Sequence, residues 1–349
     1  MFFSPLDFKH LAPSYGNYYI IISHFQPLDK YAIAKKAKQL YNIIKNFERG
    51  CDMGKLIGIE ERGAGKVNLY LDVLSDGSSG FHRIKSIMQS VTLCDRVIVS
   101  AIKDCATDVN IECELPFIPT DERNIAHIAS KLFLSEIGET AKINIRLQKR
   151  IPVAGGMAGG SADGAAVLMA LNRLYGNPLS KDTLLSLGAK LGSDVPFCII
   201  GKTALCEGRG EILTPVQNRA RLLYLIVPSS ESVSTPWAYS ELDRLYGDFS
   251  GREQENEARL FRLVGALADG DVKGICDNMY NIFESAILEQ RPLAKKAKEL
   301  LLENGAVGAM MSGSGPTVFG IFDNEKARSR ALAIVKDAGY FAKTAESIL

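Results

Sequence analysis

The sequence predicts an α+β protein built from two domains. Its 349 residues are 46% hydrophobic, which is enough apolar material for two cores. Segments of alternating hydrophobicity, such as 66–74 (KVNLYLDVL) and 141–151 (AKINIRLQKRI), predict strands. Residues 121–138 and 292–305 have the apolar spacing of helices instead. Strands, turns and helices mixed in this way indicate the α+β class.

The expected elements follow in order along the chain. In the first half we expect a helix at 121–138 and strands at 66–74, 86–93, 95–102 and 141–151. The second half starts with a buried strand within 221–230. Helices are then expected at 251–272, 275–288 and 292–305. Residues 306–322 (AVGAMMSGSGPTVFGIF) predict a strand, a glycine turn and a second strand.

The first 52 residues differ from the rest and are treated as an N-terminal extension. Residues 1–52 are rich in aromatic residues and poor in glycine, and Asp29 could cap a helix that ends at Phe47. Two interpretations stay open: a docking helix, or a segment outside the working protein with Met53 as the native start. The remaining chain divides into an N-terminal domain over 53–218 and a C-terminal domain over 219–349.

Composition argues against several classes of protein. Lys and Arg number 41 and Asp and Glu 40, so no net charge draws the chain to nucleic acid or a membrane surface. No apolar run approaches the ~20 residues of a membrane span, and the start lacks a signal-peptide pattern. The seven cysteines form no C-x-x-C pair, and only four histidines are present. We expect a cytoplasmic monomer or homodimer that acts on a small molecule and has no metal site built from these residues.

Glycines cluster in residues 152–176, PVAGGMAGGSADGAAVLMALNRLYG, between a predicted strand and a predicted helix. A helix N-terminus exposes unpaired N–H groups, and glycines before it let the backbone approach a phosphate. Ser161 can add a hydroxyl donor or a magnesium ligand. Alternatively, the glycines let two helices pack closely. The spacing matches neither the lysine-containing Walker A loop nor G-x-G-x-x-G.

Two further segments favour a bound phosphate. Lys66 and Asn68 are two residues apart on a predicted strand, so their side chains lie on one face. Asp194 stands among apolar residues in LGSDVPF. A lysine, an aspartate and an anion-binding loop together supply the charge neutralisation, positioning and proton acceptor that phosphoryl transfer needs.

Four motifs resemble those of the GHMP kinase superfamily: GKVNLYLDVL, PVAGGMAGGSADGAA, LGSDVPF and MMSGSGPTVFGIF. The double-glycine loop GGMAGGSAD and the segment CEGRGEILTPV are most similar to its 4-diphosphocytidyl-2-C-methyl-D-erythritol kinase branch. The resemblance covers residues 57 to about 345 in order. It implies a ribosomal-protein-S5-like N-terminal domain that binds ATP and a ferredoxin-like C-terminal domain.

The resemblance also implies roles for the motif residues. Lys66 and Asp194 match the catalytic pair, in which Asp194 accepts or orients the proton of the substrate hydroxyl and Lys66 stabilises the charge there. Asn68 would help to hold the substrate. Six residues match the ATP phosphate loop: Pro152, Gly155, Gly156, Gly159, Gly160 and Ser161. Residues 312–317 match the C-terminal glycine motif, which supports the active site.

A cytosine pocket is implied by two distant segments. Phe81 and His82 match the segment that stacks on and hydrogen-bonds the base, and Tyr239 matches the aromatic residue on its other side. Thr235 belongs to the same substrate-facing segment. Phe81 replaces the usual tyrosine. Arg83 replaces the usual glutamate, which places a cation beside the pocket and puts substrate affinity in doubt.

The implied activity is transfer of the ATP γ-phosphoryl group, with Mg²⁺, to the 2-hydroxyl of 4-diphosphocytidyl-2-C-methyl-D-erythritol in the non-mevalonate isoprenoid pathway. Two alternatives stay open: another kinase of the superfamily, of the mevalonate or homoserine kinase type, and a ligand sensor without turnover. Cytidine nucleotides should compete with the substrate of a cytidyl kinase but not with that of a mevalonate or homoserine kinase. The presence of both Lys66 and Asp194 argues against a sensor without turnover.

Overall fold

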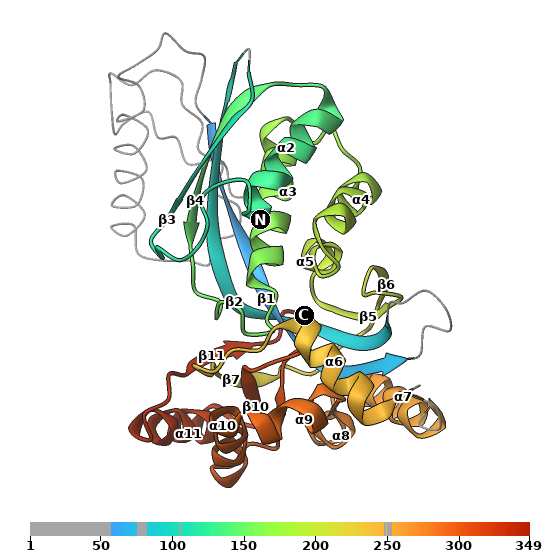
Figure 1. The fold of residues 1–349 in the computed structure, drawn as a ribbon. Helices are drawn as coiled ribbons and strands as arrows, with labels where there is room; N and C mark the ends of the chain where they lie inside the picture. The colour runs from blue at the N-terminus through green and yellow to red at the C-terminus, as the bar shows by residue number, and fades with distance from the viewer. Residues whose placement is uncertain (1–56, 75–81, 105, 248, 250–252) are drawn as a thin grey trace, which may run out of the picture.

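The structure, a computed structural model, describes residues 57–74, 82–104, 106–247, 249 and 253–349. The expectations for the N-terminal extension, its capped helix and the Met53 start lie outside these residues. Within them the chain forms two β-sheets with helices packed against each, which confirms the predicted α+β class (Figure 1). No described helix is long and apolar enough to cross a membrane.

The first sheet has seven strands and carries its helices on one side (Figure 1). The strand order is β3-β4-β2-β1-β8, and β5 pairs with both β2 and β6. The strands are β1 (Ile57–Leu74), β2 (Arg83–Lys103), β3 (Asp108–Cys113), β4 (Ala141–Gln148), β5 (Thr203–Glu207), β6 (Ile212–Pro215) and β8 (Tyr280–Asn281). The helices are α2 (Ile125–Ile137), α3 (Gly159–Leu174), α4 (Lys181–Leu191) and α5 (Val195–Ile200).

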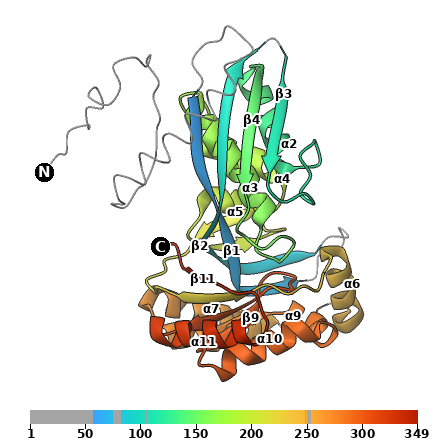
Figure 2. The ribbon, with the colours of Figure 1, turned by 90° about the vertical axis from the view of Figure 1, so that its left-hand side faces the viewer.

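The second sheet has four strands in the order β11-β7-β10-β9, and every neighbouring pair is antiparallel. Its strands are β7 (Leu223–Val227), β9 (Gly308–Met311), β10 (Val318–Phe322) and β11 (Lys343–Glu346). The helices of this half are α6 (Thr235–Tyr246), α7 (Glu253–Asp269), α8 (Val272–Asn278), α9 (Phe283–Ile287), α10 (Pro292–Glu303) and α11 (Glu325–Asp337), with a short 3₁₀ helix at Leu288–Gln290. In this order β11, the last strand of this half, lies beside β7, its first strand, which is the ferredoxin-like order expected for this half. In Figure 2, α10 and α11 lie below the sheet, away from the first one.

The two halves of the chain are joined through the first sheet and through a common core. β8 comes from the second half of the chain but pairs in parallel with β1, Tyr70 opposite Tyr280. One hydrophobic cluster contains Leu69 from β1 together with Tyr224 from β7 and Leu263 from α7. The predicted boundary at 218/219 falls in the connection between β6 and β7. The division into separate domains stays a prediction, because this core is continuous across both sheets.

Three predicted elements differ from the structure. The strands expected at 86–93 and 95–102 are one continuous strand, β2, because β1 pairs with it on both sides of a register shift near residues 91–93. The helix expected at 275–288 is broken into α8 and α9. Tyr280 and Asn281 pair there with β1, and this pairing overrides the helical spacing of the sequence.

β1 and α3 approach so closely that Gly63 has no room for a side chain. A Cβ there would lie 2.7 Å from the carbonyl oxygen of Ala162 and 2.9 Å from its carbonyl carbon. Both atoms belong to the backbone of α3, so a side chain at Gly63 would fit only if the helix moved away from β1.

We therefore expect Gly63→Ala to lower the free energy of unfolding by about 1–3 kcal/mol, measured by urea denaturation. Gly58→Ala, on the same strand, is the control, because a Cβ there would meet nothing closer than Val99 O at 4.0 Å. Equal stability of the two variants would contradict the close packing of α3 on β1.

Candidate active site

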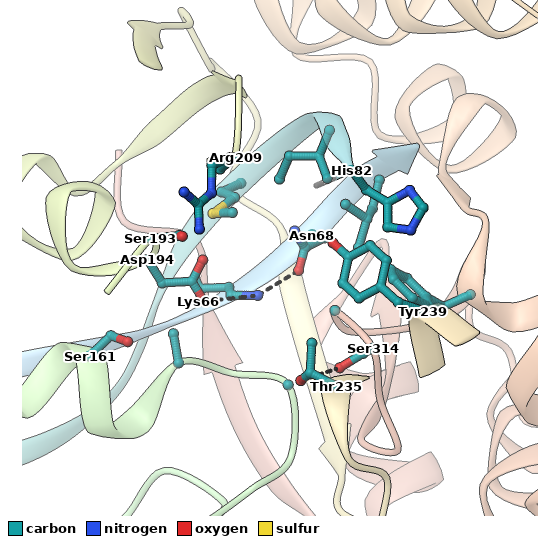
Figure 3. Close-up of a pocket in the computed structure, with 17 residues that line it drawn as sticks. Lys66, Asn68, His82, Ser161, Ser193, Asp194, Arg209, Thr235, Tyr239 and Ser314 are labelled. Carbon is teal, nitrogen blue, oxygen red and sulfur yellow. Dashed lines mark hydrogen bonds and ion pairs between the residues drawn. The ribbon is translucent and has the colours of Figure 1, made fainter. Parts of the chain in front are cut away.

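A cavity of about 460 Å³ is formed by residues from both halves of the chain (Figure 3). Its lining consists of Lys66, Asn68, Leu71, His82, Ile84, Met88, Gly156, Ala158, Ser161, Ser193, Asp194, Arg209, Thr235, Tyr239, Phe283, Gly313 and Ser314. Most of the predicted site residues are therefore brought together. The exceptions are Pro152, Gly155, Gly159 and Gly160, which belong to the loop but do not line the cavity, and Phe81, which lies outside the described residues.

Lys66 is the buried cation of the cavity. Its ammonium donates a hydrogen bond to Asn68 Oδ1 at 2.7 Å, as expected for two residues on one face of a strand. Asp194 Oδ2 lies 3.8 Å from the same ammonium. The Lys66 side chain is 5% exposed and that of Asp194 31%, so the carboxylate is the more accessible partner.

β1 holds this pair through its irregular backbone. Register shifts interrupt the pairing with β2 between Ala64 and Lys66 and between Asn68 and Tyr70. The N–H of Lys66 donates to the carbonyl oxygen of Met157, which joins the strand to the glycine-rich loop. Asn68 Nδ2 donates to Ser86 Oγ at 2.8 Å, which fixes the amide and through it the lysine.

Asp194 precedes the short helix α5 as its N-cap, but its side chain makes no capping hydrogen bond. The carboxylate faces Lys66 and the cavity instead (Figure 3). Pro196 follows in the first turn, where the missing N–H has no helical partner to lose. A carboxylate within reach of a substrate hydroxyl is suited to accept its proton.

The glycine-rich loop packs against the C-terminal glycine motif at 312–317. Ser312 Oγ donates to the carbonyl oxygen of Gly156 at 3.0 Å. A Cβ on Gly156 would lie 2.1 Å from Ser312 O, and one on Gly155 2.3 Å from Thr317 Oγ1. These two glycines are therefore required by contact with the other half of the chain, whether or not a phosphate binds.

The loop ends at the N-terminus of α3. Ala158, the N-cap residue, has a φ of 57° and no side chain that could cap the helix. The first N–H groups of a helix have no partner within it, so those of α3 are suited to an anion. Ser161, in this first turn, adds its hydroxyl to the cavity wall.

Aromatic side chains form the other end of the cavity. The His82 ring stacks on Tyr239 with centroids 5.0 Å apart and planes at 6°, and the edge of Phe249 packs against it. His82 Nε2 lies 3.0 Å from Asp243 Oδ1. Burial raises the pKa of the Tyr239 hydroxyl to about 12, with Asp194 adding to the shift. The imidazole thus covers the face of Tyr239 on which a base was expected to stack.

Sequence reasoning missed several lining residues, of which Arg209 is the most important. It sits in the turn between β5 and β6, and its N–H donates to Glu211 Oε2 at 2.7 Å. The segment CEGRGE contains it, yet nothing in the sequence shows that this turn reaches the cavity. Ser314 belongs to the predicted 312–317 motif and lines the cavity, and its hydroxyl lies 3.2 Å from that of Thr235. Arg83, expected beside the pocket, is exposed and does not line the cavity.

The described cysteines Cys198 and Cys206 are not suited to act as thiolate nucleophiles. Burial raises the pKa of the Cys206 thiol to about 12, and it raises that of Cys198 as well. Both thiols are therefore protonated at neutral pH. Among the residues that the structure describes, no three His, Cys, Asp or Glu side chains are grouped so that they could hold a metal ion.

Family models match both halves of the chain. The GHMP kinases N-terminal domain matches residues 124–202, and the GHMP kinases C-terminal model matches 263–340. A solved homoserine kinase from Cytophaga hutchinsonii and a mevalonate kinase of L. major share the fold, with TM-scores of 0.65 and 0.67 at 20% and 14% identity. Fold and family models thus point to the GHMP kinase class.

More similar proteins narrow the class. A solved 4-(cytidine 5'-diphospho)-2C-methyl-D-erythritol kinase has a TM-score of 0.68 and 27% identity, covering 83% of this chain and 99% of its own. The 4-diphosphocytidyl-2-C-methyl-D-erythritol kinases of Alkaliphilus metalliredigens and Lachnoclostridium phytofermentans are 40% identical over 266 residues and 39% over 279. These alignments cover 76% and 80% of this chain and 88% and 93% of the relatives. The chain belongs to the 4-diphosphocytidyl-2-C-methyl-D-erythritol kinase family.

Gly156→Ala is expected to lower the free energy of unfolding by at least about 2 kcal/mol, because Gly156 has a φ of +75° and contacts the backbone of Ser312. Gly160→Ala is the matched control. Its Cβ would meet only Ile125 Cδ1, at 3.7 Å, so helix stability should stay the same or rise by about 0.5–1 kcal/mol.

Thermal and urea unfolding of both variants measures the difference. A Gly156→Ala protein as stable as the Gly160→Ala protein would show that the contact with the 312–317 motif is not required for folding.

Proposed function

We propose that the protein transfers the γ-phosphoryl group of ATP to the 2-hydroxyl of 4-diphosphocytidyl-2-C-methyl-D-erythritol. The observation that carries this proposal is a single cavity that joins the start of α3, the Lys66–Asp194 pair and Tyr239. ATP, the acceptor hydroxyl and the cytosine would occupy these places in that order. The relatives that bear this name support the choice of substrate.

The acceptor hydroxyl would contact both Lys66 and Asp194, whose charged atoms are 3.8 Å apart. As the hydroxyl oxygen attacks the γ-phosphorus, Asp194 accepts its proton. The bond from the γ-phosphorus to the bridging oxygen breaks, and ADP leaves. Lys66 stabilises the negative charge on the transferring group, and Asn68 holds its ammonium in place.

The ATP phosphates would bind at the start of α3, where Gly159, Gly160 and Ser161 are its first three residues. The Ser161 hydroxyl lines the cavity and fits one position in the oxygen shell that Mg²⁺ prefers, with phosphates and water supplying the others. When bound, Mg²⁺ neutralises charge on the phosphates.

The cytosine would stack on Tyr239. Because His82 covers this ring in the structure, the imidazole has to move aside before the base can lie there. A displaced His82 could turn its edge to the base and offer one donor and one acceptor. Phe283 packs edge-on against Tyr239, with centroids 5.1 Å apart, and so supports the stacking surface.

The remaining expectations belong to the same proposal. Nearly equal numbers of basic and acidic residues, 41 and 40, support a small-molecule substrate rather than nucleic acid. We propose a cytoplasmic enzyme that works as a monomer or a homodimer.

Asp194→Asn is expected to lower kcat by about 10²–10⁴-fold, because the amide cannot accept the hydroxyl proton. ATP affinity, measured by calorimetry, should change little, since Asp194 lies on the acceptor side. Asp182→Asn, an exposed residue in the first turn of α4, is the control and should leave kcat unchanged. Near-normal turnover of the Asp194→Asn protein would refute its role as the proton acceptor.

Tyr239→Ala is expected to raise KM for the cytidyl substrate about 5- to 150-fold, which corresponds to the ~1–3 kcal/mol of one base stack. Tyr239→Phe keeps the ring and should stay close to the unaltered enzyme. Cytidine nucleotides should compete with the substrate in steady-state assays. A protein that phosphorylates mevalonate or homoserine and ignores cytidine nucleotides would belong to the alternative kinase type.

A further inference from the structure

One buried group of charges has no part in the proposed mechanism. Lys149 directly follows β4, and its ammonium contacts the carboxylates of Asp95 on β2 and Asp163 in α3. It also donates to the carbonyl oxygen of Gly159 at 3.3 Å. The side chains of Lys149, Asp95 and Asp163 are 4%, 0% and 5% exposed, so water screens none of these charges.

These contacts hold both ends of the glycine-rich loop. Where the loop begins, the Asp95 carboxylate accepts hydrogen bonds from the N–H groups of Arg150 and Ile151, the second at 2.8 Å. Where the loop ends, Lys149 bonds to Gly159 and Asp163 in the first turns of α3. The two ends are therefore tied to a single carboxylate on β2.

Stability alone does not account for such a cluster. Buried ion pairs lose hydration that their attraction recovers only in part, and apolar side chains of similar size often stabilise a fold as well. An ammonium beside a helix N-terminus also opposes the helix dipole. Asp163 Oδ1 has no hydrogen-bond partner in the described part of the chain. Burial raises the pKa of its carboxyl to about 7.

We propose that Lys149 is a positioning residue for ATP, which fixes the geometry of the phosphate loop through Asp95 and Asp163 without touching the nucleotide. The inference rests on the proposed function, because it takes the loop as the site of the ATP phosphates. Groups that orient a reacting phosphate have to be placed closely, since a shift of about 1 Å can reduce the rate ~10²-fold.

Lys149→Met in the full chain tests the proposal through calorimetric ATP binding and steady-state kinetics. We expect Kd and KM for ATP to rise about 10-fold or more, while KM for the cytidyl substrate changes less than about 2-fold. A merely structural role would lower only the folded fraction, and it would leave the kcat per folded molecule and both KM values unchanged.

Arg96→Met is the matched control. Arg96 neighbours Asp95 on β2, but its side chain lies on the opposite face, where it donates to Glu60 Oε1 at 2.8 Å and to Gln148 Oε1 at 2.7 Å and contacts neither Lys149 nor the loop. It should keep the ATP affinity of the unaltered protein. Lys149→Gln keeps N–H donors without the charge, and it serves as the test if the methionine variant does not fold.

Three outcomes would overturn the positioning role. The first is normal ATP affinity in Lys149→Met or, where that variant fails to fold, in Lys149→Gln. The others are an equal loss of ATP affinity in Arg96→Met and an equal rise in KM for ATP and the cytidyl substrate. An unaltered protein that does not bind ATP would instead overturn the proposed function, so the two failures are distinguishable.

Discussion

The cavity depends on the contact between two glycine turns, one from each half of the chain. Gly155 and Gly156 lie so close to Thr317 and Ser312 that neither could carry a side chain. Because the loop leads directly into α3, this contact also sets where the N-terminus of that helix faces. The carbonyl oxygen of Met157 in the same loop accepts a hydrogen bond from the N–H of Lys66, so β1 is placed by the same turn. Helix terminus, lysine and glycine motif are thus held as one unit.

Local pattern was enough to predict most of the fold, and it failed where distant residues pair. Alternation and helical spacing predicted β4, α2 and α10, because each has a face that is buried along its length. Residues 275–288 have the spacing of a helix, but the edge of β1 offers hydrogen bonds to Tyr280 and Asn281. A vacant strand edge more than 200 residues earlier in the chain leaves no mark on the local sequence.

The site was predicted through motifs more than through periodicity. Strand alternation placed Lys66 beside Asn68, and the chemistry of phosphoryl transfer grouped the lysine with Asp194, but only the resemblance added Tyr239. Phosphate binding and close packing are not alternatives in the segment 152–176, because different residues of it serve each. Gly164 packs against Ile125 of α2, where a Cβ would lie 2.5 Å from Cγ2, while Ser161 of the same segment lines the cavity. Arg209 went unnoticed because the position of a hairpin turn depends on the whole sheet.

In the proposed site, the imidazole of His82 and the cytosine base would compete for the same ring, that of Tyr239. If the base binds on Tyr239 as proposed, it has to displace the imidazole from that ring and from Asp243, so its observed affinity is lower than the intrinsic one by the free energy of these contacts. An aromatic pair contributes about 0.5–1.5 kcal/mol, which is up to roughly a tenfold weaker Kd. Inhibitor design can use this difference. A compound that leaves His82 in place and fills the cavity towards Met88 and Arg209 would bind without that penalty.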